Sequence, residues 1–567
     1  MKSGRLIRGP LPWRTLFAAL ALLCALELQA AAQPERIAIA SAHPAATVAG
    51  QETLALGGNA FDAAVAISAA LAVVEPYGSG LGGGGFFLLR EAGNSPTYRF
   101  LDARERAPQA AHADLYRVDG EIRQELSLNG ALAAAIPGLP AALVELAERF
   151  GRLPLRDSLA PAIRLASSGV SIDRVYRERA GWRIDAMRQD AETARIFLDN
   201  GNIPDEYGLL RQPELAHTLE QLGSQGHHGF YAGKVAEHLV RAVRDAGGIW
   251  TLKDLADYRV VERAPLRVAL EQGRELISAP PPSAGGIALA QSLLMLQQLP
   301  WQQADRVQRT HLIVETLRRA YRDRGLLGDP DFVHNPVQQL LAPAYLQQLT
   351  GSIDPQRATP SSNLPPSKAW QEGDHTTHFS VLDSEGNAVA ATLSINLPFG
   401  AAFTAPGTGV LLNNEMDDFA ADVQGANAYG LSGSQANRIA AGKRPLSSMS
   451  PSFIESTEEF TSFGTPGGSR IPSMVLLAML EYLDQQPTEH WPATPRFHHQ
   501  FMPDVIEHEP QAFSAAETSA LTALGHQLKS TGRQYGNQQV LLWNKANGAV
   551  KAASDPRGIG LAVPAAQ

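Results

Sequence analysis

Two adjacent threonines, Thr376 and Thr377, precede His378 in a stretch that could carry out nucleophilic chemistry. A threonine hydroxyl is a weak nucleophile and needs a neighbouring base to take its proton. His378 is a poor candidate for that base, because side chains two residues apart on a strand point the same way and its ring would lie alongside Thr376. Paired threonines also occur in ordinary strands. The chemistry therefore depends on the elements that surround Thr376.

Residues 374–396 are expected to form two strands joined by a tight turn. Strand-forming residues occupy 378–382 and 388–394, and turn-forming residues lie between them. A three-residue loop would place Gly386 in the left-handed conformation and would pair Thr376 with Ser394. A two- or four-residue loop would turn Ser394 to the other face of the hairpin. The pairing of the two hydroxyls depends on which loop forms.

Two irregular segments lie outside this hairpin. Residues 354–373 are rich in proline and serine and lack periodicity, so we expect an exposed, flexible segment. Four glycines, Gly82–Gly85, lead into an apolar strand at 86–89. Phosphate-binding glycine loops follow a strand and open a helix, so this order indicates close backbone packing instead.

Helices are predicted where apolar residues recur at helical spacing. Asn59 is a capping residue in front of an alanine-rich helix over 60–74. Further helices are expected at 139–150, 233–248 and 306–324. The last one carries four arginines that we interpret as a solvated or salt-bridged surface: Arg318, Arg319, Arg322 and Arg324.

Residues 1–30 have the layout of a secretory signal peptide, with a basic start, an apolar run and small residues at the end. The apolar run is short for a permanent membrane span, although an uncleaved anchor is the alternative. Signal removal would take away Cys24, the one cysteine of the sequence, and would shift the net charge from −9 to −12. We therefore expect a secreted protein, periplasmic in a Gram-negative bacterium, without disulfides and without a nucleic-acid-binding surface.

Four ordered segments around Thr376 resemble signature segments of the γ-glutamyltransferase family. They read HTTHFSVLD, LLNNEMDDF, KRPLSSMSP and GTPGGSR. Further similar segments, among them GGNAFDAAVA, VEPYGSGLGGGGF, LDARERAP and ASDPR, extend the resemblance from about residue 37 to residue 561. The resemblance implies an α/β (α+β) fold, the four-layer αββα sandwich of the N-terminal-nucleophile hydrolases.

The resemblance also implies a precursor that cleaves itself between His375 and Thr376. The products would be a large subunit, 31–375, and a small catalytic subunit, 376–567, which together form one αββα unit. Cleavage would free the α-amine of Thr376, and α-amines have a pKa of about 8 in model peptides, which suits a base near neutral pH. By the same resemblance, Ser394 would orient the Thr376 hydroxyl.

The implied reaction is transfer of a γ-glutamyl group from a donor such as glutathione to water or to an amino acid or dipeptide acceptor. Acyl transfer builds negative charge on the carbonyl oxygen, and the backbone N–H groups of Gly467 and Gly468 match the family's oxyanion hole. Without the resemblance, a simple turn would explain these two glycines.

Six residues match the positions that hold the donor's α-carboxylate and α-ammonium in the family. Those for the carboxylate are Arg104, Ser447 and Ser448. Those for the ammonium are Asn396, Glu415 and Asp418. Simpler interpretations are a surface ion pair of the arginine, a serine turn and an ordinary acidic loop. Tyr429 occupies the position of a lid loop in some bacterial members.

No cofactor and no metal are predicted, because the pairs His227–His228 and His498–His499 lack the helical spacing of metal ligands. The expected partners are small molecules, with the two subunits as a heterodimer. The alternatives are a cephalosporin (glutaryl) acylase or a poly-γ-glutamate-processing enzyme on the same fold, and, in another class, a non-catalytic binding protein. A glutaryl group has no ammonium, so an acylase would leave Glu415 and Asp418 without a role.

Overall fold

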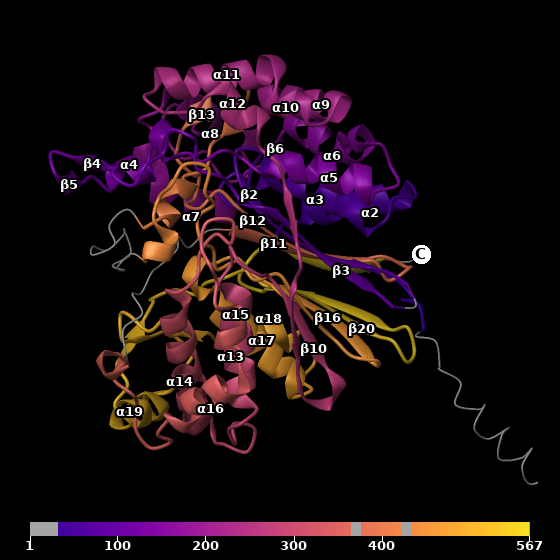
Figure 1. The fold of residues 1–567 in the computed structure, drawn as a ribbon. Coiled ribbons are helices and arrows are strands. Elements are labelled where there is room, and N and C mark those ends of the chain that lie inside the picture. The colour runs from indigo at the N-terminus through magenta and orange to yellow at the C-terminus, as the bar shows by residue number, and fades with distance from the viewer. Residues whose placement is uncertain (1–31, 94, 365–375, 421–433, 566–567) are drawn as a thin grey trace, which may run out of the picture.

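The computed structural model describes residues 32–93, 95–364, 376–420 and 434–565, so the predicted signal peptide lies outside the described part. Two antiparallel sheets stack at the centre of this part (Figure 1). The first has the order β22 (Leu561–Ala565), β1 (Ile37–Ser41), β11 (Thr376–Leu382), β12 (Ala388–Ser394), β2 (Gly84–Glu91), β3 (Thr97–Ala103) and β8 (Val261–Arg263). The second has the order β21 (Val550–Ser554), β20 (Gln539–Asn544), β16 (Glu459–Gly464), β15 (Ser452–Glu455), β10 (Glu275–Ser278) and β9 (Leu266–Ala269).

Helices cover the outer face of each sheet, which gives the expected αββα sandwich (Figure 1). The layer on the first sheet, at the top of the view, contains α2 (Pro44–Ala55), α3 (Ala60–Val74), α5 (Leu139–Arg149), α6 (Leu155–Ser168), α9 (Pro213–Gln225), α10 (His228–Tyr231), α11 (Gly233–Asp245) and α12 (Leu252–Ala256). The layer on the second sheet contains α13 (Gly285–Leu296), α14 (Arg306–Arg324), α15 (Val337–Leu340), α16 (Pro343–Gly351), α17 (Ile471–Leu483), α18 (His490–Ala493) and α19 (Ala515–Ala523).

The remaining elements are short or lie beside the sandwich. The helices are α4 (Glu125–Leu128), α7 (Arg174–Met187) and α8 (Ala191–Phe197). The strands are β4 (Arg117–Val118), β5 (Glu121–Ile122), β6 (Val170–Ser171), β7 (Leu209–Leu210), β13 (Thr404–Ala405), β14 (Val410–Leu411), β17 (Phe497–His498), β18 (Ile506–His508) and β19 (Leu528–Ser530).

Alternating side chains of the first sheet build two separate cores. Phe87 and Leu89 of β2 point into the core between this sheet and its helices. Phe86 and Leu88 point the other way, into the core that the two sheets share with the second helical layer. Side chains alternate between the two faces of a strand, so a sheet covered on both sides must be apolar on both. The central strands are consequently buried along almost their whole length.

The predicted helix after Asn59 is confirmed as α3, and each of its side chains is buried. The Asn59 side chain accepts hydrogen bonds from the backbone N–H groups of Phe61 and Asp62, at 2.9 and 3.1 Å, which caps the helix. The close packing expected at Gly82–Gly85 is confirmed as well. A Cβ atom at Gly82 or Gly83 would collide with a backbone carbonyl oxygen of another segment of the chain, that of Leu411 or Ser394.

The hairpin has the three-residue loop. Gly386 has φ +88°, and the Asp383 backbone N donates to the Asn387 carbonyl oxygen at 3.0 Å. Thr376 therefore pairs with Ser394, as that register predicts. Both strands of the hairpin lie inside the first sheet, between β1 and β2. The hydroxyls of Thr376 and Ser394 consequently start from neighbouring points on a rigid, buried sheet.

The prediction of a solvated arginine face on the helix at 306–324 is wrong. All four arginines are buried in α14. Glu315, one turn earlier, accepts hydrogen bonds from Arg318 and from Arg319, the latter at 2.6 Å. Asp504, from the other half of the chain, also pairs with Arg318. The charges are tolerated inside because carboxylates and carbonyl oxygens surround them.

The exposed segment expected at 354–373 is described only as far as residue 364, and that part packs against the protein. Ser361 is buried, and its backbone N donates to Asp504 Oδ2 at 2.7 Å. The Ala358 backbone N donates to the Leu524 carbonyl oxygen at 2.7 Å. Most of the described residues of this segment, among them 354–357, are exposed as expected, and Ala358 and Ser361 are the buried points at which it is held against the protein.

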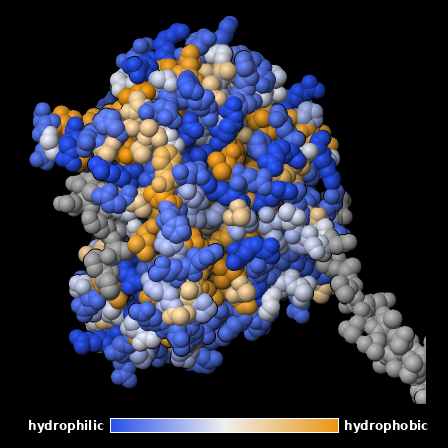
Figure 2. Space-filling view, in the orientation of Figure 1, coloured by the Kyte–Doolittle hydropathy of each residue, from blue (hydrophilic) through white to orange (hydrophobic). Residues whose placement is uncertain are grey.

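Hydrophilic residues dominate the face of the molecule shown in Figure 2, and apolar side chains appear there in small groups. Among the helices of the described residues, none has both the length and the apolar character required to cross a bilayer.

Candidate active site

Thr376 begins β11 and lines a pocket that opens to solvent. The backbone N–H of Gly467 donates to the Thr376 Oγ1 atom at 3.2 Å. Gly467 follows β16 and has φ +138°, and Gly468 has φ +55° at the start of a short turn before α17. Both values lie in the region that favours glycine. The structure thus brings the predicted nucleophile against one of the two predicted oxyanion-hole glycines.

Ser394 and Asn396 lie at the end of the partner strand. The Ser394 Oγ atom accepts a hydrogen bond from the Asn396 backbone N at 2.8 Å. Asn396 has φ +70°, so the chain turns sharply there. Its side-chain amide donates to the Asn414 carbonyl oxygen at 3.0 Å. This bond connects the end of the hairpin to the acidic turn that starts at Glu415.

Arg104 lies between Glu415 and Asp418 and forms an ion pair with each of them. All three side chains are buried. Arg104 Nε also donates to the Pro445 carbonyl oxygen at 3.2 Å, which brings it next to the predicted serines. Burial raises the pKa of Glu415 and of Asp418, and Arg104 opposes that rise. The structure therefore joins the predicted carboxylate-binding and ammonium-binding groups in one cluster.

Ser447 and Ser448 follow Leu446, whose carbonyl oxygen accepts a hydrogen bond from Arg104 Nη2 at 3.3 Å, and both serines are buried. Arg324 of α14 donates to Ser448 Oγ from Nη2 at 3.1 Å, and its positive charge opposes the rise that burial causes in the pKa of Asp418. Sequence reasoning missed Arg324 as a member of this cluster. In the sequence, Arg324 has the same helical spacing as the other arginines of α14, so no local pattern distinguished it as a residue of the candidate site.

Comparison with known proteins identifies the family. The γ-glutamyltranspeptidase family model matches residues 46–565. The chain belongs to the γ-glutamyltranspeptidase family. The glutathione hydrolase proenzyme of Pseudomonas sp. strain A14 is 39% identical over 531 residues, which cover 92% of each chain. That of Escherichia coli K12 is 37% identical over 532 residues, covering 92% of this chain and 90% of the relative.

Solved structures agree on the fold. Cephalosporin acylase from Bacillus halodurans superimposes with a TM-score of 0.82 at 25% identity, over 94% of this chain and 96% of that one. A Helicobacter pylori γ-glutamyltranspeptidase chain has a TM-score of 0.55 at 36% identity, over 57% of this chain and 94% of that one. The sequence-based predictions of the family, of the sandwich fold and of an enzyme of this type are therefore confirmed.

A buried carboxyl group that sequence reasoning passed over, that of Glu75, lies beside Thr377 and the predicted nucleophile, Thr376. Glu75 belongs to the segment VEPYGSG, which carried the resemblance without a role. Its Oε2 atom accepts a hydrogen bond from the Thr377 hydroxyl at 2.7 Å, and its Oε1 atom accepts one from Tyr77 at 3.2 Å. Burial raises the pKa of Glu75, with the two hydroxyls opposing the rise. Glu75 and Thr376 line the same pocket.

Glu105 is a second such group. Its carboxyl is fully buried, and neither oxygen has a hydrogen-bond partner among the described residues. The nearest Arg104 nitrogen is 3.6 Å away. Burial raises the pKa of Glu105 to about 7, with Arg104 opposing the rise. Arg104 is thus surrounded by three acidic side chains, those of Glu105, Glu415 and Asp418.

The histidines considered as a base or as metal ligands make contacts inside the protein. His378 is buried, with Nδ1 2.8 Å from the Thr392 hydroxyl, and burial lowers its pKa to about 3. Within the described residues, His311, Glu315 and His526 have possible metal-ligating atoms within 4.8 Å of one another. The oxygens of Glu315 already receive hydrogen bonds from two arginines, so this group lacks the free carboxylate of a metal site. His375 and Tyr429 lie outside the described residues.

Proposed function

We propose that this protein is a self-processing γ-glutamyltransferase and glutathione hydrolase with Thr376 as its nucleophile. The observation that carries this proposal is the Gly467 N–H group at 3.2 Å from Thr376 Oγ1, inside the family's sequence pattern. A hydroxyl beside a preorganised backbone donor can attack a carbonyl carbon while that donor stabilises the developing oxyanion.

The proposed reaction has two steps. Thr376 Oγ1 bonds to the γ-carbonyl carbon, its proton passes to the free α-amine of the same residue, and the amide C–N bond breaks. The proton then leaves with the departing amine. In the second step, water or an amine attacks the ester and gives a proton to the α-amine, the bond to Thr376 breaks, the proton passes to Thr376 Oγ1, and glutamate or a new γ-glutamyl amide is released. The second catalytic glycine, Gly468, completes the oxyanion hole, and Ser394 orients the hydroxyl.

The buried cluster around Arg104 suits a zwitterionic donor. A γ-glutamyl group carries one carboxylate and one ammonium on the same carbon. The carboxylate takes the place of an acidic side chain on Arg104, with Ser447 and Ser448 as further hydrogen-bond donors. The ammonium is held by Asn396, Glu415 and Asp418. The cluster exchanges internal ion pairs for pairs with the ligand, so charge balance is kept in a buried site.

The α-amine of Thr376 exists only after the chain breaks between His375 and Thr376. We therefore infer a precursor with a signal peptide at 1–30 and export to the periplasm or medium. The mature heterodimer consists of residues 31–375 and 376–567. Both pieces contribute strands to both sheets, which supports their staying together as one sandwich after cleavage.

A glutaryl acylase is the second candidate, because a cephalosporin acylase superimposes well on this chain. A glutaryl group has the carboxylate for Arg104 but no ammonium for Glu415 and Asp418. Two buried carboxyl groups on one arginine are more than a glutaryl ligand needs, which favours the γ-glutamyl donor.

Intact mass of the purified protein tests the proposal, with wild type and Thr376→Ala compared. The wild type is expected to give two fragments, the smaller beginning at Thr376, and to release glutamate from glutathione. Thr376→Ala is expected to remain one inactive chain, and Thr392→Ala, a hydroxyl on the partner strand, serves as the control that still cleaves. Turnover of glutathione by an unbroken wild-type chain would refute the mechanism.

A further inference from the structure

The peptide group between Pro466 and Gly467 is hydrogen-bonded on both of its sides. Its N–H group is the Gly467 donor that lies 3.2 Å from Thr376 Oγ1. Its carbonyl oxygen, that of Pro466, accepts a hydrogen bond from the Thr465 hydroxyl at 2.9 Å. In a planar trans peptide the N–H and C=O bonds point in opposite directions. A bond that holds the carbonyl oxygen therefore also fixes the direction in which the N–H group points.

The Thr465 hydroxyl has its hydrogen directed toward Pro466. The Thr465 side chain is fully buried, and its oxygen accepts a hydrogen bond from the Asn537 backbone N at 3.2 Å. A hydroxyl has one hydrogen to donate and two lone pairs that accept. Because Asn537 occupies the acceptor side, the hydrogen is left for the Pro466 carbonyl oxygen. Thr465 thus connects Asn537 to the peptide that carries the Gly467 N–H group.

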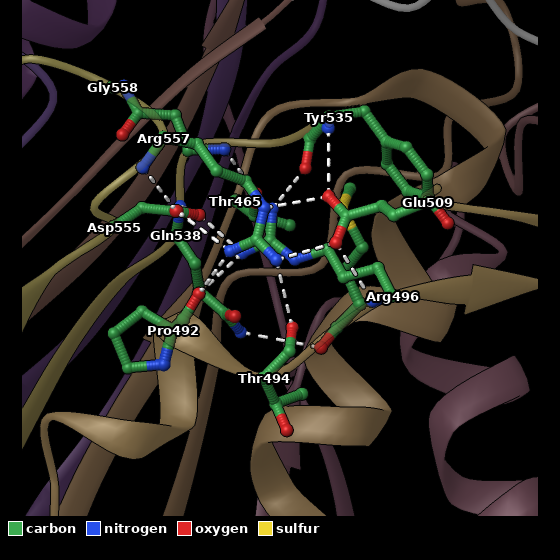
Figure 3. Close-up of polar contacts among 12 residues, drawn as sticks. Thr465, Pro492, Thr494, Arg496, Glu509, Tyr535, Gln538, Asp555, Arg557 and Gly558 are labelled. Atoms are coloured by element: carbon green, nitrogen blue, oxygen red, sulfur yellow. Dashed lines mark hydrogen bonds and ion pairs between the residues drawn. The ribbon is translucent and has the colours of Figure 1, made fainter. Parts of the chain in front are cut away.

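A buried ion network holds the segment 535–538, which contains Asn537, in place (Figure 3). Four charged side chains form this network: Arg496, Glu509, Asp555 and Arg557. Glu509 accepts a hydrogen bond from the Tyr535 backbone N at 3.0 Å, and Asp555 accepts one from the Gln538 backbone N at 2.9 Å. The segment is therefore fixed on both sides of Asn537, so the group that orients Thr465 has little freedom to move.

The peptide that carries the Gly468 N–H group is held in a similar way. Its carbonyl oxygen, that of Gly467, accepts a hydrogen bond from the Arg470 backbone N at 3.1 Å. The Arg470 N–H group shares a peptide with the Ser469 carbonyl oxygen, which accepts a hydrogen bond from the Tyr321 hydroxyl of α14. A chain of hydrogen bonds thus runs from the Tyr321 side chain through two peptide groups to Gly468. Hydrogen bonds in such chains polarise one another.

We propose that Thr465 and Tyr321 are positioning residues that aim and polarise the two N–H groups of the oxyanion hole, those of Gly467 and Gly468. Donors of this kind are effective only when they already point to the place where the negative charge develops. Thr465 belongs to the proposed small subunit and Tyr321 to the large one, so each subunit supports one of the two donors. This inference rests on the proposed γ-glutamyl transfer and adds residues that do not contact the substrate.

Steady-state kinetics of Thr465→Val and Thr465→Ser on γ-glutamyl-4-nitroanilide test the inference. Thr465→Val keeps the shape of the side chain without its hydroxyl and is expected to lower kcat about tenfold. Its KM is expected to stay within about twofold of the wild-type value, because the oxyanion forms only after binding. Thr465→Ser keeps the hydroxyl and is expected to restore most of kcat.

Thr461→Val is the matched control. The Thr461 hydroxyl is also buried, and it donates to a backbone carbonyl oxygen, that of Ile454, at 3.0 Å. It lies within β16, before the turn that carries the two glycines. Loss of this hydroxyl is expected to leave kcat at the wild-type value. A fall in kcat that is specific to Thr465→Val therefore reports on the turn and not on buried hydroxyls in general.

Two inhibitors separate positioning from general damage to the site. 2-Amino-4-boronobutanoic acid is the boronic acid analogue of the γ-glutamyl group and forms a tetrahedral anion on a hydroxyl nucleophile, whereas the γ-carboxylate of glutamate stays planar. Thr465→Val and Tyr321→Phe are each expected to raise Ki for the boronic acid about tenfold, because its anionic oxygen needs the oriented donors. Ki for glutamate is expected to remain unchanged.

All proteins are first shown by gel to be cleaved into two chains, and Tyr321→Phe replaces Thr465→Val in the kinetic test if the latter stays uncleaved. Unchanged kcat in the cleaved variants, equal weakening of both inhibitors, or a Thr465→Ser variant as slow as Thr465→Val would overturn the inference. An active wild type would leave γ-glutamyl transfer intact in each of these cases. A wild type without activity on γ-glutamyl-4-nitroanilide would overturn the proposed function and this inference with it.

Discussion

Replacing Asp418 by asparagine separates a γ-glutamyl donor site from a glutaryl site. Asp418 is buried and forms an ion pair with Arg104. Asparagine keeps the shape and can still accept a hydrogen bond, but it removes the charge that the donor ammonium would bind. A hydrogen bond to a charged group contributes about 1.5–3 kcal/mol, which corresponds to about 10- to 150-fold in kcat/KM. That loss is expected with γ-glutamyl-4-nitroanilide.

The same variant is expected to lose much less on glutaryl-4-nitroanilide, which has no ammonium. The change in the ratio of the two kcat/KM values is therefore the quantity to measure, since it cancels any general damage to the site. Asp417→Asn is the matched control, because Asp417 is also buried but binds the Ser127 hydroxyl at 2.6 Å and not Arg104. Equal losses on both anilides, or full γ-glutamyl activity in Asp418→Asn, would contradict the assigned role.

Three further predictions concern single residues in and around the proposed active site. Gly467→Ala is expected to lower kcat about 100-fold or more, because its Cβ would lie 2.5 Å from Met474 Cε at a φ of +138°; near-normal kcat in the processed variant would count against the oxyanion hole. We propose that the Glu75 carboxylate, which accepts a hydrogen bond from Thr377, assists cleavage of the precursor before Thr376. Glu75→Gln is therefore expected to slow cleavage in a gel time course, because an amide cannot take a proton from Thr377, and an unchanged rate would exclude this role of Glu75. Glu105 has a folded pKa of about 7 against an ordinary 4.5, so its contribution to stability falls as pH rises through that window. The free energy of unfolding of Glu105→Gln, measured with denaturant, is therefore expected to rise relative to that of the wild type as the pH is raised from 5 to 8. A difference between the two proteins that does not change with pH would contradict a buried, protonated Glu105.

The hairpin shows what local sequence rules can predict. The alternation of side chains and the glycine in the turn were enough to pair Thr376 with Ser394, given the three-residue loop. Helix α3 could be predicted equally well, because its capping residue and the apolar run that sets its length are adjacent in the sequence. These features depend on neighbours within one element, and the physical rules that govern them act over the same short range.

The arginines of α14 show where those rules stop. Helical spacing placed Arg318 and Arg324 on predictable faces, but their partners, Asp504 and Ser448, come from distant parts of the chain. Glu315 lies three residues before Arg318, a spacing that could have suggested an internal ion pair. Nothing in the sequence around Glu105 indicated that its carboxyl group would be buried without a hydrogen-bond partner, because the assembled fold decides which side chains are buried.

The position of Thr376 in the sheet explains how a chain break could create a catalytic group without loosening the site. β1 pairs with β11 only from Phe379 onward, whereas β12 pairs with it along its whole length, including Thr376. A break before Thr376 would therefore leave the new chain end held by Ser394 and its neighbours on one edge of the strand. The other edge of the first three residues is not paired with β1, which leaves room for the liberated amine to act. Since β11 and β12 lie between β1 and β2, the small subunit would remain enclosed by strands of the large one, and the geometry of the nucleophile would survive its own cleavage.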